Sequence, residues 1–369
     1  TIGGPPTTST APPTTRPSVP VPTYVDFSGF NDHTVPVVSS VDEFFALARP
    51  GVSGQSAVKF TIADLAGNPQ ISWMDSNFYS LHDEWYWFRL LNGAAVPGAA
   101  TDPVAGSRFE TIQQIYEWAA AQPPLSLPLD LEFVGGQASG NRLYSNLFYD
   151  LSLMDPRVFG PGTVAYFPTS TNGSARWVLE LEFHDVPEVA EVALFFEMIG
   201  ASLPPEISNQ LEWVVRSPEQ ASVAAAMAAG SLPFHDRAIT YGELVEPGTV
   251  AVYNEGIAAG RLLLIGEGGK ELNDAGENDI LLIENVPDYL PPGRALISSA
   301  PQTPLAHVNL LARNRGIPNA SQAGILQDPA IQQAARVRAH AIVRASAADG
   351  LSVVLITKEQ YDQWLDKGE

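Results

Sequence analysis

The chain has 369 residues, an apolar fraction of 45% and a formal net charge of −21. This length suffices for two or three domains, and the negative charge makes nucleic acid and anionic membrane surfaces unfavourable partners. The absence of cysteine excludes disulfides, thiolate catalysis and thiolate metal ligands. No stretch of the sequence reaches the roughly 20 apolar residues of a transmembrane helix.

Residues 1–23 form a tract of Pro, Thr and Ser that cannot bury a core, so we expect an extended tail. One interpretation is a disordered stalk between a surface anchor and the folded body. The other is docking between chains, because an extended proline-rich segment has little conformational entropy to lose on binding. We therefore predict that the tail links copies of the chain into homo-oligomers or filaments. The residues expected to make these contacts are Thr1, Pro5, Pro6, Pro12, Pro13 and Arg16.

The chain begins with Thr1 rather than Met, so it is either processed or a part cut from a longer chain. If it is processed, a signal peptide has been removed, and we then expect an exported protein, at the cell surface or outside the cell. Residues 24–246 then predict an α+β domain whose role the sequence does not indicate. Its expected strands are 57–64, 70–74, 162–168 and 175–183, and its expected helices are 41–48, 108–121, 188–199 and 218–229.

An aromatic-rich segment at 77–88 contains His82 next to two acids, Asp83 and Glu84. With Trp73, Trp85 and Trp87 it could form an acid/base or sugar-binding site, but an aromatic core with one polar edge is the commoner outcome. Two His–Asp pairs have no third partner at a recognisable spacing, so we expect no metal site there. These pairs are His184–Asp185 and His235–Asp236.

Residues 247–369 predict an α/β domain. Strands are expected at 250–254, 260–266, 279–285 and 295–300, followed by a helix from about residue 305. The acid- and glycine-rich run 266–279 lacks the spacing of a calcium loop and predicts a solvated hairpin loop. Residues 358–366 are expected to form a closing helix.

The most informative residue of this domain is His307, which we place in the first turn of that helix, at the domain surface. The free backbone N–H groups and the positive end of the helix dipole suit an imidazole that accepts a phosphoryl group. The dipole also keeps a nitrogen lone pair available for attack. Arg313 and Arg315 follow where one of them could reach an anionic partner. A capping or solvated histidine is the alternative.

The segment 301–319 resembles the phosphohistidine swivelling domain of the pyruvate phosphate dikinase family, which includes phosphoenolpyruvate synthase and glucan water dikinase. The matching residues are Thr303, Leu305, His307, Val308, Leu310, Leu311, Ala312, Arg313, Gly316, Ile317 and Pro318. Upstream, residues 258–266 and 278–300 look like the family's preceding strands. The resemblance implies a domain with β/β/α layers at 247–369, His307 as the phosphorylated residue and Thr303 beside it.

Two departures concern the histidine loop, where Ala306 replaces the usual Ser or Cys, and Pro301 and Gln302 replace paired glycines. More loosely, the whole body resembles bacterial proteins that contain a PEP/pyruvate-binding domain. The segments that carry this weaker resemblance are Tyr79-Ser80-Leu81-His82 and residues 166–170.

Two functions follow from these observations. The family's nucleotide-binding domain and its pyruvate-binding barrel do not fit in residues 24–246. We therefore expect no ATP or phosphoenolpyruvate turnover by this chain alone, and no cofactor in it. The first function is an exported structural or interaction protein that assembles through its tail. The second is a phosphoryl carrier in which a separate kinase, using Mg²⁺ with ATP or phosphoenolpyruvate, loads His307.

Overall fold

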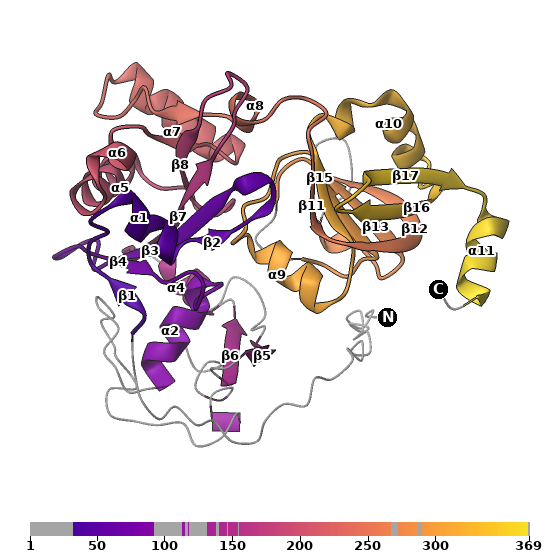
Figure 1. Cartoon of the computed structure of the whole chain (residues 1–369), viewed down its shortest axis with the longest axis horizontal. Coiled ribbons are helices and arrows are strands. Elements are labelled where there is room, and N and C mark those ends of the chain that lie inside the picture. Colours follow the sequence, from indigo (N-terminus) through magenta and orange to yellow (C-terminus); the bar gives the residue numbers. More distant parts are fainter. Residues whose placement is uncertain are drawn as a thin grey trace, which may run out of the picture.

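The protein is described here from a computed structural model covering residues 32–91, 113–114, 117, 131–137, 140–145, 147–153, 155–266, 272–286 and 290–367. It is a mixed α/β structure with two large sheets, as the sequence predicts in outline (Figure 1). The tail at 1–23 and most of the helix expected at 108–121 lie outside the described residues. The chain passes from the first sheet to the second between Ile239 and Val250.

The N-terminal sheet has the order β1-β4-β3-β7-β8-β9-β10, with β2 beside β3. A separate hairpin pairs β5 with β6. The strands are β1 Thr34–Val35, β2 Arg49–Pro50, β3 Ser56–Ala63, β4 Gln70–Met74, β5 Leu131–Gln137, β6 Gly140–Ser145, β7 Phe159–Phe167, β8 Arg176–Glu180, β9 Leu211–Val214 and β10 Ala238–Ile239. The helices are α1 Val41–Leu47, α2 His82–Leu91, α4 Leu147–Ser152, α5 Val189–Ser202, α6 Pro205–Ser208, α7 Pro218–Ala229 and α8 Tyr241–Leu244, with a 3₁₀ turn, η1, at Val52–Gly54.

The two faces of the N-terminal sheet differ because side chains alternate along each strand. In β3, Val58, Phe60 and Ile62 enter a core shared with α1, α5, α6 and α7. The intervening Lys59 and Thr61 are also buried, on the opposite face. This second face has its own small apolar cluster, which includes Leu305 from the other half of the molecule. The polar face of the N-terminal sheet is therefore the one that meets the C-terminal half.

The C-terminal sheet has the order β11-β15-β14-β13-β12-β16-β17 and curls so that its edge strands, β11 and β17, contact each other. Strands β12 to β15 pair in parallel, whereas β11 and β16 join antiparallel. The strands are β11 Val250–Asn254, β12 Gly256–Ile265, β13 Asp279–Ile283, β14 Ala295–Ser298, β15 Asn319–Gln322, β16 His340–Ser346 and β17 Gly350–Ile356. The helices are α9 His307–Asn314, α10 Pro329–Arg336 and α11 Lys358–Asp366, with 3₁₀ turns η2 Leu272–Asp274 and η3 Ile325–Gln327.

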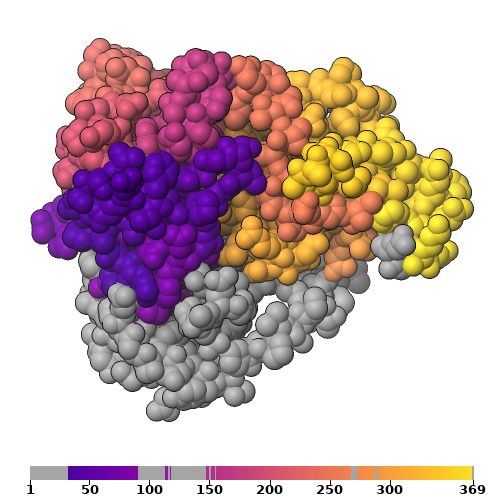
Figure 2. Space-filling view, viewed as in Figure 1, coloured from indigo at the N-terminus to yellow at the C-terminus, as the bar shows by residue number. Residues whose placement is uncertain are grey.

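Helices pack on both sides of the C-terminal sheet. The apolar side of α9 covers Leu263, Leu281 and Leu296, and α10 packs on the opposite cluster around Leu262 and Ile280. Figure 1 shows α9 on the side of this sheet that faces the N-terminal half. In the space-filling view the orange C-terminal atoms lie directly against the indigo and rose N-terminal atoms (Figure 2). The first turn of α9 is consequently part of the junction between the halves.

Candidate functional site

His307 is the first residue of α9, after Ala306 as N-cap, so the prediction of a first-turn position is confirmed. The predicted surface position is wrong, because only 6% of His307 is exposed. The sequence argument considered the C-terminal domain alone. In the structure, Leu305 inserts into the apolar cluster on the second face of the N-terminal sheet and brings the histidine with it. His307 is therefore enclosed between the two halves.

The loop before α9 is fixed by three buried amide side chains. Asn319 donates to Gln302 Oε1 at 2.8 Å and to Asn309 Oδ1 at 2.6 Å. In turn, Gln302 donates to Asn319 Oδ1 at 2.8 Å, and Asn309 donates to the carbonyl of Thr303 at 2.6 Å. Because these contacts join the loop, α9 and β15 to one another, the amides set the position of His307. Sequence reasoning missed this network, although Asn309 interrupts an apolar helical run.

The N-terminal sheet supplies charged groups opposite this loop. Glu180 ends β8, and Glu182 lies two residues further on, so both side chains leave the strand on one face. Arg216 lies two residues after Val214, the last residue of β9, so the side chains of these two residues also leave their strand on one face. Because Glu180 pairs with Val214 across the parallel strands β8 and β9, Glu182 and Arg216 come next to each other at the strand ends. Lys59 from β3 lies on the same face.

These groups form what we call the junction cluster, consisting of Lys59, His82, Glu182, Arg216 and His307. The Oε1 atom of Glu182 lies 3.9 Å from His307 Nε2 and 3.9 Å from Lys59 Nζ, and its Oε2 lies 3.6 Å from Arg216 Nη1. A single carboxylate therefore contacts the imidazole of His307 and two cationic side chains. All three contacts are largely shielded from water, since the Glu182 side chain is 11% exposed and the others are less exposed.

His82, the first residue of α2, is held neutral by its surroundings. Its Nε2 lies 3.0 Å from the carbonyls of Phe60 and Gly162, which places the ring proton on Nε2. Its Nδ1 lone pair then faces Lys59 Nζ at 3.4 Å. Burial, followed by the nearby Lys59 charge, lowers the pKa of His82 well below its usual value. Burial also lowers the pKa of Lys59, against the raising effect of Glu182.

A second carboxylate, Glu180, connects the cluster to the loop of His307. Glu180 accepts a hydrogen bond from the Tyr241 hydroxyl at 3.0 Å, and its carboxylate also bonds the Thr303 side chain. Burial is the main cause that raises the pKa of Glu180, and Arg216 opposes it. Thr303, which the resemblance places beside the histidine, therefore joins the histidine loop to the N-terminal sheet.

Ligand atoms of His82, Glu182 and His307 lie within 4.8 Å of one another, which is a set of donor types suited to a divalent metal ion. The sequence did not predict this grouping, because the three residues come from distant segments. However, the Lys59 ammonium group already lies close to His82 Nδ1 and to Glu182. We therefore describe the arrangement as buried ion pairs around Glu182, in which Lys59 occupies the position that a metal ion would need.

The other residues singled out in the sequence have different surroundings. Arg313 is exposed in the last turn of α9, and Arg315 donates to the carbonyl of Leu290. Trp73, Trp85 and Trp87 are fully buried and belong to the interior, so the packing interpretation accounts for them. Asp185 forms a two-pronged ion pair with Arg157, at 2.8 and 2.6 Å, and His235 Nδ1 lies 2.7 Å from the Leu232 carbonyl.

No family model matches the chain, and no curated protein matches it significantly. Within the described ranges, no helix is both long and apolar enough to cross a membrane. The fold and the junction cluster are therefore the observations on which a function has to be argued.

Proposed function

We propose that the protein is a phosphoryl carrier in which His307 is the acceptor and the junction cluster is its resting site. The observation that carries this proposal is the contact of one carboxylate, Glu182, with His307, Lys59 and Arg216. Two cationic side chains thus share a carboxylate with the candidate nucleophile, and cations near the acceptor favour phosphoryl transfer, because the transferred group is strongly negative. The resemblance of residues 301–319 to the phosphohistidine swivelling domain supports the same proposal.

In the transfer step, the Nε2 lone pair of His307 forms a bond to phosphorus while the bond between phosphorus and the donor's oxygen breaks. The leaving oxygen departs with the bonding electron pair, and the imidazolium that forms loses its Nδ1 proton to water, which reaches the ring while the halves are apart. Lys59 and Arg216 offset the charge of the phosphoryl group once it faces the cluster. The donor is a phosphorylated compound held by a separate kinase. Since His307 is enclosed in the structure, loading requires the two halves to separate.

The test is the detection of acid-labile, alkali-stable phosphate on the protein after incubation with ATP and a cell extract. We expect the label on the wild-type chain and none on His307→Asn. His235→Asn is the matched control, because His235 is exposed and is not part of the cluster, and it should label like the wild type. A wild-type chain that stays unlabelled, or a His307→Asn chain that keeps its label, would contradict the proposal.

A second proposal is an exported interaction protein that assembles through residues 1–23. The enclosure of His307 favours it, because a histidine between two packed halves is shielded from a loading enzyme. In this case the junction cluster only fixes the orientation of the halves, and the surfaces used for assembly belong to the tail. Both the export and the contacts of the tail remain predictions.

Deletion of residues 1–23 tests the second proposal. The full chain should elute as an oligomer in size-exclusion chromatography and show ordered assemblies by electron microscopy. The truncated chain should elute as a monomer with unchanged circular dichroism, because the deletion leaves both folded halves complete. Identical elution of the two chains would count against tail-mediated assembly.

A further inference from the structure

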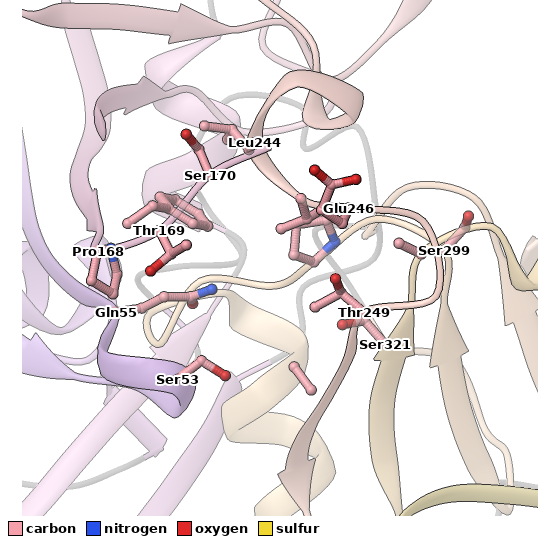
Figure 3. A pocket seen from close by; sticks show the side chains of 15 residues that line it. Ser53, Gln55, Pro168, Thr169, Ser170, Leu244, Glu246, Thr249, Ser299 and Ser321 are labelled. Atoms are coloured by element: carbon pink, nitrogen blue, oxygen red, sulfur yellow. The ribbon is translucent and has the colours of Figure 1, made fainter. Parts of the chain in front are cut away.

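Two features outside the junction cluster are open to a partner. One is a pocket of about 220 Å³ at the junction, and Figure 3 shows Gln55, Thr169 and Glu246 around it. Its lining is rich in hydroxyl groups, which both donate and accept hydrogen bonds and therefore select no ligand class. The other is the free side of strand β17, which offers a partner both backbone groups and apolar side chains.

β17 is the longest terminal strand of the two large sheets, with seven residues against two in β1, two in β10 and five in β11. Among the described residues, it pairs with β16 alone. At the start of β17, Gly350 lies beside Val250 of β11, so this end is partly covered. The other end presents backbone N–H and C=O groups to which an added strand can bond.

Apolar side chains near the end of β17 are exposed on both faces of the sheet. Val354 and Leu355 are consecutive, so they point to opposite faces, and their exposed fractions are 53% and 50%. On the face of Val354, the strand register places Ile342 next to it, and Ile257, also 53% exposed, lies on the same face at the start of β12. An exposed apolar strand with a free side is a site for pairing with another chain.

The sequence of residues 19–25, VPVPTYV, suits a strand that pairs along one side only, and we call it the Val-Pro segment. Its odd positions all carry β-branched residues, which favour strands. They are Val19, Val21, Thr23 and Val25. In a strand, alternate residues direct their backbone groups to opposite sides, so these four bring their N–H groups to one side. Pro20 and Pro22 remove the donors from the other side, which is where a terminal strand tolerates proline.

The position of the Val-Pro segment in the chain favours the β17 of a second copy over its own. Nine peptide steps separate Val25 from Thr34, the first residue of β1, and they reach at most about 30 Å. A folded body of this size is about 50 Å across. Figure 1 shows β1 and β17 on opposite sides of the molecule. The segment has no charged residue, so a body of net charge −21 does not repel it.

We propose that the Val-Pro segment of one copy adds to the free side of β17 in a second copy. This inference rests on the tail-mediated assembly proposed above and names its acceptor surface. Backbone hydrogen bonds join the two strands, and the added side chains cover Val354 and Leu355. Because the donor and the acceptor are different surfaces of one chain, the contact is head-to-tail and repeats from copy to copy.

Cross-linking between engineered cysteines tests the contact directly, because the chain has no cysteine of its own. A Val21→Cys chain is mixed with a tagged Leu355→Cys chain, and a bismaleimide linker is added. We expect mixed pairs, and none when a tagged Val337→Cys chain takes the place of Leu355→Cys, because Val337 is 64% exposed but lies outside β17. Absence of mixed pairs, or a link formed only within a chain that carries both cysteines, would overturn the proposal.

The second measurement is the protein concentration at which half of the chain is assembled. Val21→Pro should raise it about tenfold, because a donor on the pairing side is lost, whereas Ser18→Pro removes a donor on the other side and should leave it unchanged. The double variant Val354→Lys/Leu355→Lys should also raise it at least about tenfold, because lysines on a terminal strand oppose strand addition. Val337→Lys is the matched control and should assemble like the wild type.

Deletion of residues 1–23 separates this inference from the proposal on which it rests. If the deletion abolishes assembly while Val354→Lys/Leu355→Lys assembles like the wild type, the tail binds another surface and β17 is not its acceptor. If the deletion leaves assembly unchanged, tail-mediated assembly and the role of β17 are both wrong.

Discussion

Replacing Arg216 with methionine is expected to lower the free energy of unfolding by about 3–5 kcal/mol. The guanidinium group is buried and donates to the Leu181 carbonyl and, across the junction, to the Val286 carbonyl, each at 2.9 Å. It also contacts Glu182 at 3.6 Å. Methionine restores none of these bonds, so two carbonyls and part of a carboxylate lose their donor in a site that water does not reach. Urea denaturation, followed by tryptophan fluorescence, measures the loss.

Arg176→Met is the matched control for Arg216. Arg176 pairs with Glu212 at 2.7 and 2.8 Å, but both side chains of this pair are partly exposed and lie within the N-terminal half. A partly exposed pair contributes about 1 kcal/mol or less. An equal decrease in the free energy of unfolding for the two variants would show that the junction contacts of Arg216 add no stability beyond that of a partly exposed ion pair.

The second large effect concerns pH and His82. Because the pKa of His82 is lowered in the folded state, mainly by burial, the unfolded chain takes up a proton below about pH 6.5 while the folded chain does not. Protons therefore favour the unfolded state, and stability falls as the pH drops from about 6.5 toward the lowered pKa. For one histidine the expected loss is about 1.4 kcal/mol per pH unit, or about 2 kcal/mol between pH 6.5 and 5.

His82→Gln isolates this contribution, since a glutamine amide retains a donor for the Phe60 and Gly162 carbonyls but does not titrate. We expect the variant to lack the extra loss of stability below pH 6.5, whatever its stability at neutral pH. Glu180, whose pKa is raised by burial, acts in the opposite direction, and it is present in both proteins. The measured quantity is the difference between the free energies of unfolding of the two proteins at each pH. Parallel pH profiles for wild type and variant would refute the assignment to His82.

Local signals in the sequence were enough to predict many elements. The helix 358–366 matches α11, which Thr357 caps, and the helix 218–229 matches α7, which Ser217 caps. Strand alternation also predicted β3 and β4 to within one residue. Several described elements were not predicted, among them α2, β9, β15, α10, β16 and β17. In α2 the run of aromatic residues hides the helical period, because both sides of this helix are buried.

The candidate site was harder to predict than the elements. His307 stands in a recognisable local pattern, and its place on α9 followed from that pattern. Its enclosure depends on Lys59, Glu182 and Arg216, which lie 91 or more residues before it in the chain. No local rule pairs such distant positions. A lysine in the middle of an otherwise apolar strand was the one signal that could have indicated a buried partner for it.

Among the described residues, the two sheets take their strands from separate parts of the chain, and the polypeptide passes once from the first sheet to the second, between Ile239 and Val250. The contact between the halves thus resembles a complex of two partners joined by a short linker, whose main contribution is a high effective concentration. Cutting the linker would leave every junction contact chemically intact and make the association depend on protein concentration. The molecule is therefore suited to split-protein experiments, in which the strength of the junction becomes a dissociation constant between two fragments.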